Sequence, residues 1–363
     1  MWEDQLIEEK MASFLHPCGI FVTNGEVYIA DMFNHRVRKL LRNGQIVTIC
    51  GTGIQGYNGD VQLATNAQLD QPSSVLVSPS DQVYISERNR IRKIDRNGII
   101  STICGTGDNG YNGDNQLAIH AQIYNPRGLF VTEDEEVLFA DNHFQRVRKI
   151  DRHGIIRTIA GTGHVGSNGD GRLAISASLK VPTSVFQYKN EIYIADNGVG
   201  NIRKINRNGI ISTIAGYGEG SIYPHSIFVH NDDVYFTDNR HLICKILPNG
   251  MIKTIAGIEN DGGFNGDDQL ATQCTLNLTR GIFIDNDSQI YFADANNHCV
   301  RKIDQSGMMR RVVGKGDEYS GDVPFDFQQY PHIGPRKKPL IKPFPRAYHD
   351  LIVICEPVVH HRH

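Results

Sequence analysis

The feature that most constrains this chain is a sequence unit that recurs six times in 363 residues. Each unit opens on a short apolar run, and five of the six openings are prolines. The openings are Pro17, Pro72, Pro126, Pro182, Pro224 and Thr279, at intervals of 55, 54, 56, 42 and 55 residues. A repeat of this length is typical of stacked or radial arrays, in which each unit buries its apolar faces against its neighbours.

One repeat contains four strand-like runs, which we name a to d in chain order. Asn-Gly pairs follow strand a and strand c in the first repeat, and such pairs are typical of tight hairpin turns. The four runs span about residues 19–22, 27–31, 36–41 and 45–50. Four antiparallel strands and a long return loop make one propeller blade. The sequence therefore predicts an all-β fold, a six-bladed β-propeller.

The repeat resembles a known family. The runs Val27–Asp31 (VYIAD) and Asn34–Lys39 (NHRVRK), each followed by further strand and turn signals, are similar to the NHL repeat. The linker Gly51–Pro72, with its GTG and NGD segments, resembles the subgroup found in teneurins and many bacterial proteins. The resemblance implies a six-bladed propeller. It also implies a recognition platform, since some NHL propellers bind protein, some bind RNA, and a related lyase branch is enzymatic.

The repeats divide the chain into three expected parts. Residues 1–16 match the end of a linker, residues 17–334 form the six NHL-like repeats, and residues 335–363 form a tail rich in proline and lysine. The formal net charge of −3 argues against a general attraction to nucleic acid or membrane. The acidic residues near the N-terminus argue against a signal peptide, and no apolar stretch is long enough to span a membrane. We therefore expect a cytoplasmic protein without a membrane partner, and we expect it to be a monomer.

The seven cysteines do not suggest a disulfide framework or a metal site. Cys50 and Cys104 occupy repeat positions that are alanine in later repeats, so we expect small buried side chains there. Cys244 replaces an arginine of the repeat. There is no CxxC pair, and we expect neither a metal nor another cofactor.

Acidic residues recur at two places in the repeat. One series follows a glycine in the linkers and precedes a segment with helical spacing, so we expect these residues to cap a helical turn or stabilise the turn itself. The other series ends strand b, where an acidic side chain typically bonds the next turn. The linker series is Asp60, Asp114, Asp170, Asp267 and Asp322, and the strand-b series is Asp31, Glu87, Asp141, Asp196, Asp238 and Asp294.

Arginine and lysine recur together on strand c, as in Arg38-Lys39 and Arg92-Lys93. In one interpretation the strand is near the outer edge, and these side chains lay their stems on a neighbouring blade while their charges stay in water. In the other they form an RNA-binding belt, which Arg36, Arg90 and Arg146 would extend toward the loops. The lack of interleaved stacking aromatics argues against RNA.

The long linkers (d–a) and the b–c loops fall on one face, which we call the loop face, and binding residues concentrate on such loops. The residue after each opening position should line the central channel; this ring is Cys18, Ser73, Arg127, Thr183, His225 and Arg280. The ring holds no carboxylate, which argues against metal-dependent catalysis. Either it is a solvated polar lining, or Arg127 and Arg280 hold a small anion or an acidic side chain.

These observations predict a non-catalytic scaffold that binds a protein or peptide on the loop face. The alternatives are an RNA-binding propeller and a metal-dependent lactonase or lyase. The candidate contacts are Arg127, His225, Arg280, His35, Tyr57, Tyr111, Phe264 and Phe144. The three linker aromatics Tyr57, Tyr111 and Phe264 can instead pack under their own linkers. The short linker 216–224 lacks the NGD segment, which predicts a notch in the loop face between blades four and five.

Overall fold

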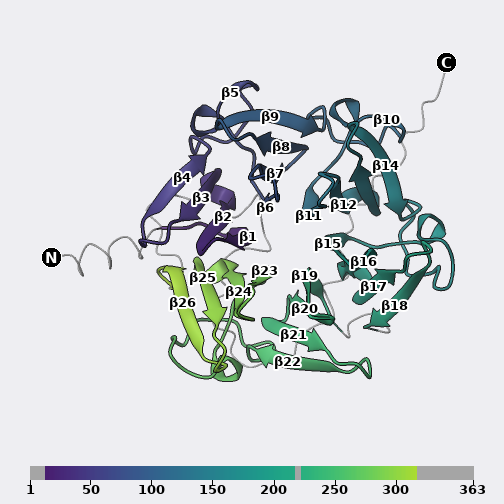
Figure 1. The fold of residues 1–363 in the computed structure, drawn as a ribbon. Coiled ribbons are helices and arrows are strands. Elements are labelled where there is room, and N and C mark those ends of the chain that lie inside the picture. The colour runs from purple at the N-terminus through teal and green to yellow at the C-terminus, as the bar shows by residue number, and fades with distance from the viewer. Residues whose placement is uncertain (1–12, 217–221, 317–363) are drawn as a thin grey trace, which may run out of the picture. The chain divides into compact units, whose positions relative to one another are not determined.

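The fold is a ring of six antiparallel sheets, which confirms the all-β, six-bladed β-propeller that the repeats predict (Figure 1). The computed structural model describes residues 13–216 and 222–316. The expected propeller limit at 334, the tail 335–363, most of the lead-in 1–16 and Asp322 lie outside these residues. Each blade takes its four principal strands from one continuous segment, with strand a innermost and strand d at the periphery.

The strands follow the predicted repeat closely. Blade one contains β1 (Pro17–Thr23), β2 (Glu26–Asp31), β3 (Arg36–Leu40) and β4 (Ile46–Cys50). Blade two contains β6 (Ser74–Val77), β7 (Val83–Glu87), β8 (Arg90–Ile94) and β9 (Ile99–Cys104). Blade three contains β11 (Pro126–Val131), β12 (Val137–Asp141), β13 (Arg146–Ile150) and β14 (Ile155–Ala160). Blade four contains β15 (Pro182–Tyr188), β16 (Glu191–Asp196), β17 (Asn201–Ile205) and β18 (Ile211–Ala215). Blade five contains β19 (Pro224–His230), β20 (Asp233–Asp238), β21 (Leu242–Ile246) and β22 (Ile252–Ala256). Blade six contains β23 (Thr279–Ile284), β24 (Ile290–Asp294), β25 (Cys299–Ile303) and β26 (Met309–Gly314).

The long linkers run along the outer edge of the following blade. In two of them a short strand adds a fifth member to the sheet: β5 (Gln62–Leu63) pairs with β9, and β10 (Gln116–Leu117) pairs with β14. A 3₁₀ turn then leads back inward; these turns are η2 (Ala64–Asn66), η3 (Ala118–His120), η5 (Ala174–Ser176) and η7 (Ala271–Gln273). A second set forms the b–c corners: η1 (Met32–Asn34), η4 (Asn142–Phe144), η6 (Asn197–Val199) and η8 (Ala295–Asn297).

The apolar cores lie between blades. Val37 and Cys50 of blade one pack in one cluster with Ile85 and Ile100 of blade two, together with Leu69 of the linker that joins them. Cys50 and Cys104 are fully buried, as their alanine-like repeat positions predicted, and the described cysteines are free thiols. Because each core is shared, no blade can bury its apolar surface alone.

Among the described residues, a side chain of the b–c corner accepts a backbone N–H before the next blade in four of the six blades: one, three, five and six. The corner residue His35 has a left-handed φ of 51°, and its Nδ1 accepts the backbone N–H of Gln71 at 3.2 Å. The same contact closes the ring, because His298 Nδ1 of blade six accepts the N–H of His16 before blade one at 3.2 Å. The ring therefore closes by the kind of contact that also follows blades one, three and five, without exchanging a strand.

Four of the five arginines of the strand-c series are buried, so the expectation that their charges stay in water is wrong for these four, whereas Arg38 of blade one is partly exposed. Four guanidinium-bearing side chains are 0% exposed: Arg92, Arg148, Arg203 and Arg301. The neighbouring lysines behave as expected, since Lys39 and Lys149 remain partly exposed and pair with Glu26 and Glu136 of strand b. The difference follows from the strand's alternation, which points successive side chains to opposite faces.

Each buried arginine joins two carboxylates that are far apart in sequence. Arg148 lies 2.9 Å from Asp114 of the preceding linker and 3.5 Å from Asp141 at the end of strand b. Arg92, Arg203 and Arg301 repeat this pattern, with linker distances of 2.7, 2.7 and 2.9 Å. The strand-b acid also accepts a backbone N–H of the incoming linker, as Asp141 does from Tyr124. The arginine thus ties strand b, strand c and the linker together.

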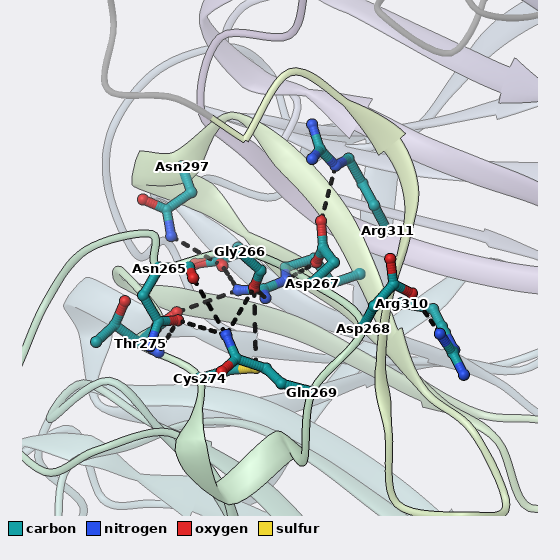
Figure 2. Close-up of polar contacts among 12 residues, drawn as sticks. Asn265, Gly266, Asp267, Asp268, Gln269, Cys274, Thr275, Asn297, Arg310 and Arg311 are labelled. Atoms are coloured by element: carbon teal, nitrogen blue, oxygen red, sulfur yellow. Dashed lines mark hydrogen bonds and ion pairs between the residues drawn. The ribbon is translucent and has the colours of Figure 1, made fainter.

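Of the two structural roles expected for Asp60, Asp114, Asp170 and Asp267, capping of a helical turn is wrong, and the described carboxylates instead pair with the strand-c arginines. The 3₁₀ turns η2, η3, η5 and η7 begin after leucines, and none has a side-chain cap. Figure 2 shows the arrangement before blade six, where Asp267 also accepts from Arg311 and Asn265 organises the loop. The glycine before each aspartate has φ near +100°, a conformation that glycine adopts without strain.

Blade five lacks both the linker aspartate and the buried strand-c arginine. Its linker lacks the NGD segment, and Cys244 replaces the buried arginine. The buried Asp238 is instead bound by Arg240 from the b–c corner, at 2.8 Å. An arginine at 244 would have no linker carboxylate to match its charge, which explains why both features are missing together.

We predict that Arg148→Leu lowers the free energy of unfolding by ~3–5 kcal/mol, because it leaves Asp141 buried without its cation. Arg157→Leu is the matched control, since Arg157 is 52% exposed and its surface pair with Asp151 contributes at most about 1 kcal/mol. Urea unfolding curves of both variants and the parent protein measure the difference. Similar small losses in the two variants would contradict a structural role for the buried arginine.

Candidate functional site

The three arginines proposed as RNA contacts are engaged within the loop face. Arg36, Arg90 and Arg146 each open strand c and donate to a linker carbonyl, at 2.8, 3.1 and 2.9 Å. The partners are the threonines of the GTG segments. The guanidinium of Arg36 packs so closely on Gly53 that a Cβ there would lie 2.4 Å from it. These side chains therefore hold the start of each linker in place.

The linker aromatics pack on the same arginines. The ring of Tyr57 lies 3.9 Å from the Arg90 guanidinium carbon, and the ring of Tyr111 lies 3.8 Å from that of Arg146. Phe264 contacts two further arginines in the same way. Of the two interpretations, packing beneath their own linkers is the one that these contacts support. Such cation–π contacts contribute about 0.5–1 kcal/mol each at partly exposed sites.

The other two loop-face candidates are also partly engaged. The Phe144 ring lies 6.4 Å from the ring of Tyr111, and the Phe144 carbonyl accepts from Arg146. His35 makes the corner contact to Gln71 described above. Both side chains retain some exposed surface. Their place on the loop face is clear, and a role in binding stays a prediction.

The exposed large apolar side chains gather on the linkers. Of those among the described residues, all but Met251 lie in linker segments. They are Ile54, Tyr57, Val61, Leu63, Leu117, Ile119, Val165, Leu173, Ile175, Tyr223, Ile258 and Leu270. Met251 directly follows the c–d turn of blade five. The linker leucines at 63, 117, 173 and 270 pair with the residue at this same position in the next blade, so they also lie beside c–d turns. Sequence reasoning missed this set, although the Leu-Ala pairs that recur in the linkers were visible.

Five of the six residues that follow the strand-a openings border one small cavity of about 40 Å³: Cys18, Ser73, Arg127, Thr183 and His225. The sixth, Arg280, does not border it, although the next residue, Gly281, does. The inner strands pack closely because small residues follow the ring. A Cβ on Gly19 would lie 2.5 Å from the Ser74 backbone, so this contact requires glycine.

Arg127 and His225 meet in this channel although they come from blades three and five. Arg127 Nη1 lies 3.1 Å from His225 Nε2. An arginine can only donate, so Nε2 of His225 must be the acceptor and Nδ1 must carry the proton. His225 Nδ1 is buried and has no hydrogen-bond partner among the described residues.

Arg280 and His16 extend this cluster. No carboxylate or hydrogen-bond acceptor of the described residues contacts the Arg280 guanidinium, and its Nε is buried without a partner. Burial lowers the pKa of Arg280 to about 10, so the side chain stays charged at neutral pH. His16 Nδ1 lies 3.2 Å from Cys18 Sγ, and His16 Nε2 also lacks a partner. His16 was not predicted; its place directly before the Pro17 opening was the available signal.

Burial sets the protonation of the cluster. It lowers the pKa of both His16 and His225 well below the usual value, and the charges of Arg280 and Arg127 lower both further. Burial also raises the pKa of the Cys18 thiol. At neutral pH the two imidazoles are therefore neutral, the thiol is protonated and the two guanidiniums are charged. The cluster, which we call the channel cluster, is His16, Cys18, Arg127, His225 and Arg280.

Residues 13–216 and 222–316 contain neither a metal-binding cluster nor a membrane-spanning helix. No group of three or more His, Cys, Asp or Glu side chains is placed to hold a metal ion. No helix in this part of the chain is long and apolar enough to cross a bilayer.

The lowered pKa values predict an acid-dependent loss of stability. The folded-state pKa of His225 lies below the unfolded value of about 6.5, so its contribution is present above that pH and is lost as the pH falls. His225→Gln keeps an acceptor for Arg127 but cannot be protonated. Between pH 7.5 and 5.5 we expect the parent protein to lose about 1 kcal/mol more than this variant in urea unfolding. Equal losses would mean that His225 titrates normally.

Comparison with known proteins agrees with the repeat pattern. The teneurin NHL domain family matches residues 50–112, 103–168 and 258–327, together more than half of the chain. Teneurin-3 of Danio rerio is 29% identical over 222 residues, which cover 53% of this chain. Teneurin-4 of Homo sapiens is 26% identical over 342 residues, which cover 85% of it. The chain spans 8% and 11% of the lengths of these two relatives.

Solved structures share the fold at low sequence identity. Virginiamycin B lyase from Staphylococcus aureus has a TM-score of 0.53 at 16% identity, with 83% of this chain and 86% of that chain covered. A gluconolactonase from Xanthomonas campestris has a TM-score of 0.55 at 12% identity, with 84% and 88% covered. These likenesses concern the fold alone. Because the family match covers more than half of the residues and agrees with the repeat and the blades, this chain belongs to the teneurin NHL domain family.

Proposed function

We propose that this propeller is a non-catalytic scaffold that binds a protein or peptide through its loop face. The observation that carries the proposal is the concentration of exposed large apolar side chains on the linkers. Apolar groups gathered on one region of a surface are typical of protein-binding sites. Ile54 and Val165 are the exposed apolar side chains that lie just after the GTG segments held by Arg36 and Arg146 on the loop face.

The linkers also hold a fixed shape, which supports the same proposal. Asn58 accepts the N–H of Gln68 at 2.8 Å and donates to the Asn66 carbonyl at 3.0 Å. Asn112 and Asn265 make the corresponding contacts in their own linkers. A surface that is already ordered loses less conformational entropy when a partner binds.

RNA binding receives less support. The guanidiniums of Arg36, Arg90 and Arg146 already donate to linker carbonyls, and two of them are covered by tyrosine rings. Binding phosphates would require these internal contacts to be given up. The metal-dependent lactonase or lyase alternative is supported by fold likeness alone. A cytoplasmic location and a monomeric state stay predictions.

The loop-face proposal predicts that charge on the linkers weakens partner binding. Ile54→Glu and Val165→Glu place a carboxylate at exposed apolar positions of two linkers, just after the GTG segments that Arg36 and Arg146 hold on the loop face. Met251→Glu is the matched control, because Met251 is 61% exposed but lies near a c–d turn. We expect the linker variants to lower affinity at least tenfold and the control to leave it unchanged.

The measurement uses two stages. Cross-linking in cells first yields candidate partners, and each candidate is then purified and titrated against the parent protein and the three variants. A purified partner that responds equally to all three variants, or to the control alone, would contradict the loop-face assignment. Binding of a single-stranded RNA that is lost on Arg90→Ala, with no protein partner found, would favour the RNA alternative instead.

The short linker 216–224 generates another prediction, although its residues 217–221 lie outside the described part of the chain. Replacing residues 217–223 with residues 52–71 supplies an NGD segment, whose aspartate needs a buried cation. We therefore expect the replacement combined with Cys244→Arg to be more stable in urea than the replacement alone, by about 1 kcal/mol or more. If the missing linker forms a notch that admits a partner, both versions should bind that partner more weakly than the parent protein does.

The two versions separate folding from binding. No gain from Cys244→Arg would mean that the arginine and the NGD aspartate are not a unit. Unchanged partner affinity in a well-folded replacement would mean that the notch has no role in binding.

A further inference from the structure

The channel cluster contains two partly exposed arginines, Arg127 and Arg280, that no carboxylate of the described residues neutralises. We propose that His16, Arg127, His225 and Arg280 bind one small oxyanion, a carboxylate or phosphate group, within the channel. This inference is independent of the proposed protein partner, because it concerns a free anion and a different part of the molecule.

Polar atoms without partners are the first argument. Arg127 Nε, Arg280 Nε, His225 Nδ1 and His16 Nε2 are all buried and make no hydrogen bond among the described residues. A buried polar group without a partner costs about 1–3 kcal/mol, and more when it is charged. A buried Nε without a partner also occurs in Arg92, Arg148 and Arg203, so the two imidazole nitrogens are the atoms that distinguish this cluster and indicate a missing hydrogen-bonding group in the channel.

The charge of the surroundings is the second argument. The groups that act electrostatically on His16 are Arg280, His298 and Arg127, and those that act on His225 are Arg280, Arg127 and His16. Cys18 adds a thiol that burial keeps protonated. Asp31 influences Cys18, but it accepts the Leu15 N–H and the Asn34 amide. Arg127 and Arg280 thus lack the carboxylate that a desolvated cation normally requires.

The strand-c arginines show that a buried arginine in this fold normally has carboxylate partners. In the same molecule each of Arg92, Arg148, Arg203 and Arg301 is matched by two carboxylates. The fold therefore neutralises buried arginine wherever the arginine serves stability. Arg127 and Arg280 keep part of their surface accessible, as expected for side chains that line a channel and meet a ligand there.

The size and chemistry of the site define the ligand. The cavity of about 40 Å³ has room for one small free anion and not for a larger molecule attached to it. Arg127 and His225 border it, and Arg280 acts electrostatically on both imidazoles. Guanidinium groups match the oxygens of carboxylates and phosphates through paired N–H donors. A proton on either imidazole would add a positive charge beside the anion, so anion binding and protonation should favour each other. On His225 this proton would replace the hydrogen bond that Nε2 accepts from Arg127.

Calorimetric titration of the purified protein with inorganic phosphate and with acetate, at constant ionic strength set by chloride, tests the proposal. We expect one phosphate or acetate per chain to bind at pH 6.5. Acetate keeps the same charge between pH 6.5 and 8, and we expect it to bind at least threefold more weakly at pH 8. The His225 imidazole should titrate at a higher pH when the anion is present, which NMR would show. The lack of any saturable heat and of any change in the His225 titration, with both anions, would overturn the proposal.

Two variants separate binding from structure. Arg280→Met should weaken anion binding at least tenfold and should not lower the melting temperature in chloride, because it removes an unmatched charge. Arg157→Met is the control for net charge and should bind the anion as the parent protein does. An Arg280→Met protein that melts well below the parent and still binds phosphate would show that Arg280 is structural and would overturn its assignment. The parent protein's own titrations decide the proposal if Arg280→Met fails to fold.

Discussion

The blades depend on the ion pairs that the buried arginine of strand c makes with two carboxylates. A desolvated guanidinium must be matched by carboxylates, so Arg148 requires both Asp141 on its own blade and Asp114 on the linker before it. This requirement links three segments of each repeat. Blade five supports this link, because it lacks both the NGD segment in its linker and the arginine at position 244.

The arginines of the channel cluster, unlike those of strand c, have no carboxylate partner among the described residues. Arg127 and Arg280 carry charge without a carboxylate, while the surrounding imidazoles are held neutral by burial and by the two arginines. Proteins tolerate such unfavourable electrostatics mainly where function needs them. This contrast between two sets of arginines in one fold marks the channel as a candidate binding site. The loop face is a candidate for a separate reason, its exposed apolar side chains.

The sequence predicted most of the fold and part of the candidate site. Blade number, strand limits and the buried Cys50 and Cys104 follow from the repeat, because a shared period forces shared local structure. Predictions about charge were less accurate: strand-c arginines expected in water are buried, and Asp60 expected as a cap binds Arg92 instead. Both errors have one cause. The linker folds along the outer edge of the next blade, and a local pattern does not contain that long-range contact.

The sequence by itself determined the architecture: six units of alternating apolar residues and Asn-Gly turns must share their cores, and a ring of inner strands places Arg127, His225 and Arg280 at one channel. Only the tertiary structure decided which polar residues are partners. The corner contact from His298 to His16 closes the ring across almost the whole chain, and Arg127 meets His225 across 98 residues. Such pairings depend on how blades and linkers are oriented in space, because hydrogen bonds and ion pairs act over a few ångströms between groups that the sequence keeps far apart.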